Sequence, residues 1–142
     1  MSLVVDTSLF ADLVFKFNEK RTRIAEEVLS AVSDIVNPRL FKVEIAGILA
    51  RRLSAQQVEQ IVSEIMEDVK LIDNPDELAF QIAAETGSRA ADAYFIATAK
   101  LTNSILLTND RIMALNAKKV GIEAYYLIEE FDAAMKRISE PE

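Results

Sequence analysis

The sequence has 142 residues and is 51% hydrophobic, enough apolar material for one substantial core, so we expect a single domain over residues 1–142. It contains no cysteine and no histidine, which excludes disulfides, thiolate nucleophiles and imidazole groups and leaves acid-base or metal chemistry mainly to carboxylates. The net charge of −7 argues against a nucleic-acid binder that relies on simple electrostatic attraction.

The chain begins with an apolar segment that predicts a strand. It lacks the basic region and cleavage site of a secretory signal, and no apolar run approaches ~18 residues, so we expect a soluble cytoplasmic protein without a membrane span. Four short apolar or β-branched runs predict strands, and a further run is a candidate fifth. The four are Leu3–Val5, Ile35–Val36, Ile105–Thr108 and Ile122–Leu127, and the fifth is Val69–Ile72.

The segments between these runs have apolar residues at helical spacing. They cover residues 8–17, 22–32, 39–53, 55–66, 75–85, 89–101, 111–120 and 129–138. Signals for helix ends are Ser54 with Gln57, Asn74-Pro75 with Glu77, Gly87 and Gly121. Strands that alternate with helices predict an α/β fold in which a parallel sheet is covered on both faces.

Two acidic residues directly follow predicted strands. Asp6 ends the first strand, and Asp110 closes the run that begins at Ile105. Ligands of open α/β sheets bind at the carboxyl ends of strands, so both carboxylates meet in one crevice if these two strands are neighbours. The alternative for each is an ordinary loop aspartate that caps the following helix.

Two more acidic residues interrupt apolar helical surfaces. Asp92 lies in the segment Ala90–Ala97, and Glu44 projects from an apolar stripe. An unpaired carboxylate is costly to bury, so each must be paired, protonated, bound to a metal or turned toward a polar cleft. The alternatives are a favourable first-turn position for Asp92, and for Glu44 an ion pair with Arg51 or Arg89 or a place at the edge of the stripe.

Together these four acids, Asp6, Glu44, Asp92 and Asp110, predict a divalent-metal site. Carboxylates placed a few ångströms apart repel one another unless a cation compensates, and Mg²⁺ or Mn²⁺ suits oxygen ligands and phosphate substrates. Such an ion lowers the pKa of a bound water and stabilises charge on a phosphodiester oxygen. Basic residues that could contact a phosphate backbone near the site are Arg39, Lys42, Arg51, Arg52, Arg89, Lys100 and Arg111.

At these acidic residues the sequence resembles the PIN-domain family, and specifically the VapC-type toxin ribonucleases. The resemblance rests on four fragments whose order and separations match the family over essentially the whole chain: Val4–Ser8, Val43–Ala46, Ala91–Ala99 and Leu107–Asp110. It implies a three-layer α/β/α fold with a central parallel sheet of about five strands in the order 3-2-1-4-5.

The resemblance also implies an activity, namely Mg²⁺- or Mn²⁺-dependent hydrolysis of single-stranded RNA by an endoribonuclease. Members are often homodimers inhibited by a cognate antitoxin protein. The residues that would coordinate metal and carry catalysis are Asp6, Glu44, Asp92 and Asp110. The residues that would orient ligands or water are Thr7, Ser8, Thr108 and Asn109.

Other functions stay open at this point. The fold could serve as a non-catalytic RNA- or protein-binding module in which the acids form structural pairs. A phosphatase of the haloacid-dehalogenase type is disfavoured because the run Asp6-Thr7-Ser8 lacks the second aspartate that those enzymes use two residues on. Apolar helix faces within residues 8–32 could accept an antitoxin helix or could face the core.

Overall fold

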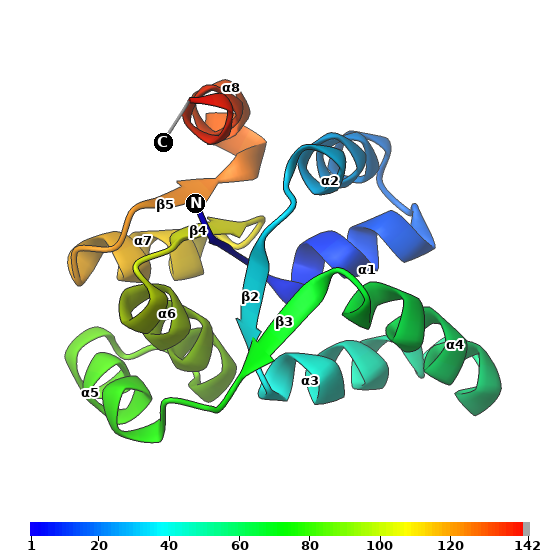
Figure 1. The fold of residues 1–142 in the computed structure, drawn as a ribbon, viewed down its shortest axis with the longest axis horizontal. Helices are drawn as coiled ribbons and strands as arrows, with labels where there is room; N and C mark the ends of the chain where they lie inside the picture. Colours follow the sequence, from blue (N-terminus) through cyan, green and yellow to red (C-terminus); the bar gives the residue numbers. More distant parts are fainter. Residues whose placement is uncertain (141–142) are drawn as a thin grey trace.

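The computed structural model describes residues 1–140, so the last two residues of the expected domain lie outside the described part. Strands and helices alternate along the chain (Figure 1). The strands are β1 (Leu3–Val5), β2 (Ile35–Pro38), β3 (Val69–Ile72), β4 (Ile105–Thr108) and β5 (Ala124–Tyr126). The helices are α1 (Thr7–Phe15), α2 (Glu19–Ala31), α3 (Leu40–Leu49), α4 (Ala55–Met66), α5 (Asp76–Thr86), α6 (Ala90–Thr102), α7 (Arg111–Lys119) and α8 (Leu127–Ser139). None of these helices is long and apolar enough to span a membrane.

The strands form one parallel sheet in the order β3-β2-β1-β4-β5. Leu3 of β1 pairs with Ile35 of β2 on one side and with Ile105 of β4 on the other. Helices α1 to α4 lie on one side of the sheet and α5 to α7 on the other, which gives three layers (Figure 1). The predicted α/β/α architecture and its strand order are confirmed.

The core forms on both faces of the sheet because the central strands are apolar. Every residue of β1 and β4 is buried, as expected for parallel strands that helices cover on both faces. The ring of Phe41 lies 5.0 Å from the ring of Phe10 and 6.4 Å from that of Phe95. This aromatic packing joins α1, α3 and α6, and α3 and α6 carry Glu44 and Asp92.

Some helix-end signals in the sequence hold and one fails. Helix α4 has its predicted bounds, and Ser54 and Gln57 form the predicted capping box. Gly87 ends α5 with a left-handed φ of 73°, which suits glycine. The capping box expected at Asn74 is wrong, because Asn74 Oδ1 accepts a hydrogen bond from Leu40 N at 3.1 Å. The first backbone N–H groups of α3 have no partner within the helix, and the distant Asn74 side chain satisfies that of Leu40.

Most elements differ from their predicted bounds by a few residues, and two of the differences have a clear local cause. Helix α2 begins at Glu19, earlier than predicted, because Asn18 Oδ1 accepts a hydrogen bond from Arg21 N at 3.0 Å and caps the first turn. Strand β5 covers only the later part of its predicted run, since Leu127 already begins α8. Neither difference moves a predicted site residue.

The carboxyl end of β1 is held by an internal polar side chain. The backbone register of β1 with β2 pairs only Leu3 with Ile35. Beyond that pair, the buried Asn37 accepts a hydrogen bond from Val5 N at 3.1 Å and donates one to Val5 O at 2.9 Å. The Asn37 amide thus takes the place of strand pairing just before Asp6, where the chain turns away from the sheet.

Candidate active site at the carboxyl edge of the sheet

Asp6 is buried where β1 ends, with 6% of its surface exposed. Its Oδ2 accepts hydrogen bonds from the hydroxyls of Ser8 and Thr108, both at 2.8 Å, while its side chain makes no capping bond to α1. Burial raises the pKa of Asp6 to about 6; the two hydroxyl donors oppose this rise, and the nearby charges of Glu44 and Asp92 add to it. The carboxylate is therefore not a helix cap but a buried acid held in place by hydroxyl groups.

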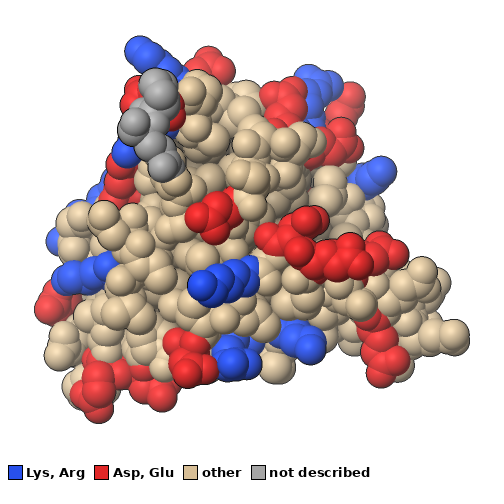
Figure 2. Space-filling model, viewed as in Figure 1, with Lys and Arg blue, Asp and Glu red and all other residues tan. Residues whose placement is uncertain are grey.

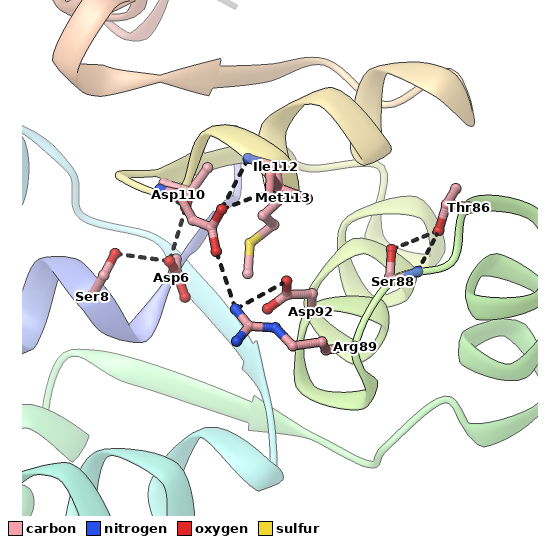
Figure 3. A network of polar contacts seen from close by, with 10 residues as sticks. Asp6, Ser8, Thr86, Ser88, Arg89, Asp92, Asp110, Ile112 and Met113 are labelled. Carbon is pink, nitrogen blue, oxygen red and sulfur yellow. Dashed lines mark hydrogen bonds and ion pairs between the residues drawn. The ribbon is translucent and has the colours of Figure 1, made fainter.

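Asp110 is linked to Asp6 through Thr108. Thr108 Oγ1 donates to Asp6 Oδ2 and accepts a hydrogen bond from Asp110 N at 2.9 Å. Asp110 Oδ1 caps α7 by accepting from two backbone N–H groups of its first turn, at 2.9 and 3.2 Å. Its other oxygen, Oδ2, lies 3.5 Å from Arg89 Nη2 (Figure 3). The capping alternative is thus observed for Asp110, and it leaves one oxygen directed toward the other acids.

Asp92 is buried in the first turn of α6, with 7% of its surface exposed. Arg89 Nη2 lies 3.8 Å from Asp92 Oδ2, so a single guanidinium reaches both Asp92 and Asp110 (Figure 3). Burial raises the pKa of Asp92 to about 6; the charges of Asp110 and Glu44 add to this rise, and Arg89 opposes it. The Arg89 side chain is 81% exposed, so it only partly neutralises the acids.

Glu44 is half-buried on α3 and faces the start of α1. Its Oε1 accepts a hydrogen bond from the hydroxyl of Thr7, the buried first residue of α1. Within residues 1–140 no arginine or lysine forms an ion pair with Glu44, so the predicted arginine partners are not observed. Because its charge raises the pKa of both Asp6 and Asp92, Glu44 belongs to the same electrostatic group.

Three of the four predicted orienting residues, Thr7, Ser8 and Thr108, each donate a hydrogen bond to one of the acids. Asn109 does not. Its Nδ2 donates to Asp12 Oδ2 at 3.0 Å, and its Oδ1 is buried without a hydrogen-bond partner among residues 1–140. This leaves one buried acceptor at the edge of the site to be satisfied by another group.

Some contributors to the site were not predicted in their observed roles. Asn37 supports the end of β1, and in the sequence it directly follows the run Ile35–Val36 that predicts a strand. Asp12 holds Asn109, but an acid on α1 carries no pattern that separates it from a solvent-facing residue. Arg89 was expected to pair with Glu44 or to contact phosphate, and its observed partners are Asp92 and Asp110.

The four acids suit a hard divalent cation by charge and donor type. They offer only oxygen atoms, and other members of the group raise the pKa of Asp6 and of Asp92. In the described part of the chain, no three acidic side chains stand at the spacing of a single metal ion. The positive charge nearest to Asp92 and Asp110 comes from Arg89. The residue types fit the cation, and close coordination would need side-chain adjustment around Arg89.

Charge on the molecular surface is mixed. On the face shown in Figure 2, acidic and basic side chains are interspersed, and no continuous basic surface is present. This distribution agrees with the net charge of −7. Binding of a polyanion would therefore depend on a few local cations rather than on the net charge of the protein.

Comparisons with known proteins assign the family. The family model for the PIN domain matches residues 3–119. Similar solved structures include PAE2754 of Pyrobaculum aerophilum (17% identity, 98% of this chain and 90% of that chain covered, TM-score 0.64). A second is VapC20 of Mycobacterium tuberculosis, a sarcin-ricin loop cleaving toxin (16% identity, 84% of this chain and 95% of that chain covered, TM-score 0.66). A third is a toxin-antitoxin complex from Klebsiella pneumoniae (20% identity, 76% of this chain and 86% of that chain covered, TM-score 0.60). No curated protein sequence matches the chain significantly. The predicted resemblance is confirmed, and the chain belongs to the PIN domain family.

Proposed function

We propose that this chain is a metal-dependent endoribonuclease that hydrolyses phosphodiester bonds in single-stranded RNA. The observation that carries the proposal is the convergence of Asp6, Glu44, Asp92 and Asp110 into one incompletely neutralised group at the carboxyl edge of a PIN-domain sheet. Buried carboxylates with raised pKa values and few counter-charges are typical of functional sites rather than of structural ion pairs.

The side chains have separable roles in this proposal. Asp6, Glu44, Asp92 and Asp110 would hold Mg²⁺ or Mn²⁺, which when bound supplies the charge that acidifies a water and offsets charge on the phosphate. Ser8 and Thr108 fix Asp6 Oδ2, and Thr7 fixes Glu44 Oε1, so these hydroxyls set the direction of the acids. Asn109 is assigned to ligand or water orientation through its unpaired Oδ1.

We further propose that the protein is the toxin of a toxin-antitoxin pair and acts as a homodimer with a cognate antitoxin as its partner. Support comes from the structural neighbours, which include a toxin-antitoxin complex and a VapC toxin. The test is co-purification from the native genomic context: a small protein that binds this chain and suppresses RNA cleavage is expected. If the neighbouring reading frame does not encode such a protein, the proposal of a cognate antitoxin is wrong.

A cleavage and metal-binding assay tests the nuclease proposal. Purified protein is expected to cleave single-stranded RNA with Mg²⁺ or Mn²⁺, to stop with chelator, and to lose most activity in the Asp92→Asn variant. At a metal concentration of 100 times the Kd, bound ion should stabilise the fold by about 2.7 kcal/mol, measured as a rise in Tm. Full cleavage by Asp92→Asn, or cleavage in chelator, would contradict the mechanism.

A non-catalytic binding module is the second candidate. It is favoured by the ion pairs from Arg89 to Asp92 and Asp110 and by the absence, within residues 1–140, of three acids at metal-binding spacing. In that case titration with Mn²⁺ should produce no stabilisation, while RNA or a protein partner still binds. Metal binding together with metal-dependent cleavage would exclude this candidate.

A further inference from the structure

A hollow begins at the acidic group and extends beyond the residues that the proposed mechanism uses. It has a volume of about 770 Å³, and its lining runs from Asp6 and Asp110 to the start of α7 and the end of β5. A phosphodiester bond placed at the acids belongs to a longer strand, and the neighbouring nucleotides must lie on adjoining surfaces. Because two of the acids line this hollow, it directly adjoins the proposed cleavage position.

Part of the lining of the hollow is an apolar wall. Ile112 and Leu115 are 65% and 48% exposed, and their spacing of three residues places them on one face of α7. Tyr126, at the end of β5, also lines the hollow and adds a partly buried aromatic side chain. Exposed apolar side chains that lie together mark binding surfaces, and a nucleobase presents a flat apolar face to such a wall.

The same hollow is bordered by two arginines. Arg111 is exposed and has no ion-pair partner among residues 1–140, so its guanidinium is available. Arg21 is restrained by Asp12, whose Oδ2 lies 3.9 Å from Arg21 Nη1. Arginine donates paired hydrogen bonds that match the geometry of a phosphate group. Because the protein has a net charge of −7, attraction of a phosphate depends on local cations such as these rather than on the electrostatic field of the whole protein.

We propose that this hollow binds the nucleotide next to the scissile phosphate, with its base against Ile112 and Leu115 and its phosphate beside Arg111. The inference rests on the proposed nuclease function and adds a substrate contact to it. An apolar wall, a free arginine and direct continuity with the acids together match a nucleotide of a single strand.

Binding of a fluorescein-labelled single-stranded RNA octamer of mixed sequence tests this assignment. The measurement is fluorescence anisotropy with Mg²⁺ in a Glu44→Gln background, because Glu44 does not line the hollow and the change is expected to prevent cleavage. Adding Ile112→Ser with Leu115→Ser should weaken binding roughly fivefold or more, the lower end of the range for loss of one stacked base. Arg111→Gln should weaken it several-fold and reduce the slope of log K against log salt by about 0.7.

Two matched variants in the same background serve as controls. Phe80→Ser removes another exposed apolar side chain, which is 72% exposed on α5, and Lys119→Gln removes a positive charge from the far end of α7. Both should leave RNA binding within twofold of the parent protein. The positions changed in addition to Glu44→Gln are all exposed, so a Tm equal to that of the Glu44→Gln parent is expected to show that the variants fold.

The outcomes separate this proposal from the nuclease assignment. RNA binding by the hollow variants equal to that of the parent, or equally weakened in the controls, would overturn the nucleotide subsite while leaving metal-dependent cleavage intact. If those variants bind RNA normally but lose a co-purifying protein, the hollow is a protein contact and the proposal is wrong. Absence of RNA binding by the parent, together with absence of cleavage by the unaltered chain, would remove both.

Discussion

The amino and carboxyl edges of the sheet are both polar, but the first carries hydroxyl groups that bond to one another and the second carries carboxylates that repel one another. At the amino edge, the hydroxyls of Ser2, Thr102 and Ser104 bond to one another, and Thr102 also donates to Thr98 O at 2.8 Å. At the carboxyl edge, the polar groups are carboxylates such as Asp6 and Asp92, whose pKa values burial raises to about 6. A hydroxyl both donates and accepts, so hydroxyls can satisfy each other; carboxylates only accept and repel one another.

This difference supports the proposal that the carboxyl edge is the functional part of the molecule. Hydroxyl networks satisfy buried polar groups without charge, and their natural role is stability. Among residues 1–140, Arg89 is the one side chain that forms ion pairs with this acidic group, and such incomplete neutralisation lowers stability. Sequences tolerate such conflicts mainly at functional sites. The predictions below test that contrast, first through activity and then through stability and metal affinity.

The largest expected effect is on RNA cleavage. Asp6→Asn should reduce the rate by roughly 100-fold or more, because it removes a charge from the proposed metal site while the Asn oxygen still accepts from Ser8 and Thr108. Ser104→Ala at the opposite edge should retain full cleavage and lose about 1 kcal/mol of stability with its hydrogen bonds. Cleavage assays measure the rates, and urea unfolding measures the stability. A Ser104→Ala protein that folds but does not cleave RNA would contradict the assignment of activity to the carboxyl edge alone.

The next effect is a pH dependence of stability in the metal-free protein. Folding raises the pKa of Asp6 from 3.8 to about 6, so between these values the folded state binds more protons than the unfolded state. The free energy of unfolding is therefore highest below pH 4 with respect to this group and falls as pH rises through about 6. For Asp6 the loss is about 3 kcal/mol, and Asp92 acts in the same direction.

Urea unfolding in chelator at pH values from 4 to 7.5 measures this dependence. The Asp6→Asn variant should show a flatter profile and be more stable than the unaltered protein at pH 7.5, because it carries no buried charge at that position. Added Mn²⁺ should remove part of the decline by compensating the carboxylates. Identical pH profiles for the two proteins would show that Asp6 is not held as a buried, destabilised acid.

The smallest effect concerns Arg89. Arg89→Gln should tighten Mn²⁺ binding by up to about fivefold, since the guanidinium pairs with the same oxygens of Asp92 and Asp110 and exposed ion pairs contribute at most about 1 kcal/mol. Isothermal titration calorimetry measures the Kd. Arg39→Gln is the control, because Arg39 pairs with Asp73 at 2.6 Å on the exposed surface. Weaker Mn²⁺ binding by Arg89→Gln would show that Arg89 supports the site instead of competing with the ion.

Much of the fold could be predicted because local physics decides it. The capping box of Ser54 and Gln57 depends on a few neighbouring residues, and apolar runs such as Ile105–Thr108 are bounded by turn residues. The box predicted at Asn74 failed because Leu40, far away in the chain, supplied the hydrogen-bond donor. Local patterns predict well until a residue distant in sequence competes for the same polar group.

The same division applies to the site. The sequence by itself determined which acids are candidates for the site. A carboxylate such as Asp92, whose helical neighbours are apolar, is costly to bury wherever the helix packs. Only the tertiary structure decided the distant partners of the acids: Thr108 for Asp6, Thr7 for Glu44, and Arg89 for Asp110. Those partners depend on strand order and helix packing, and short sequence patterns do not encode contacts between residues about a hundred positions apart.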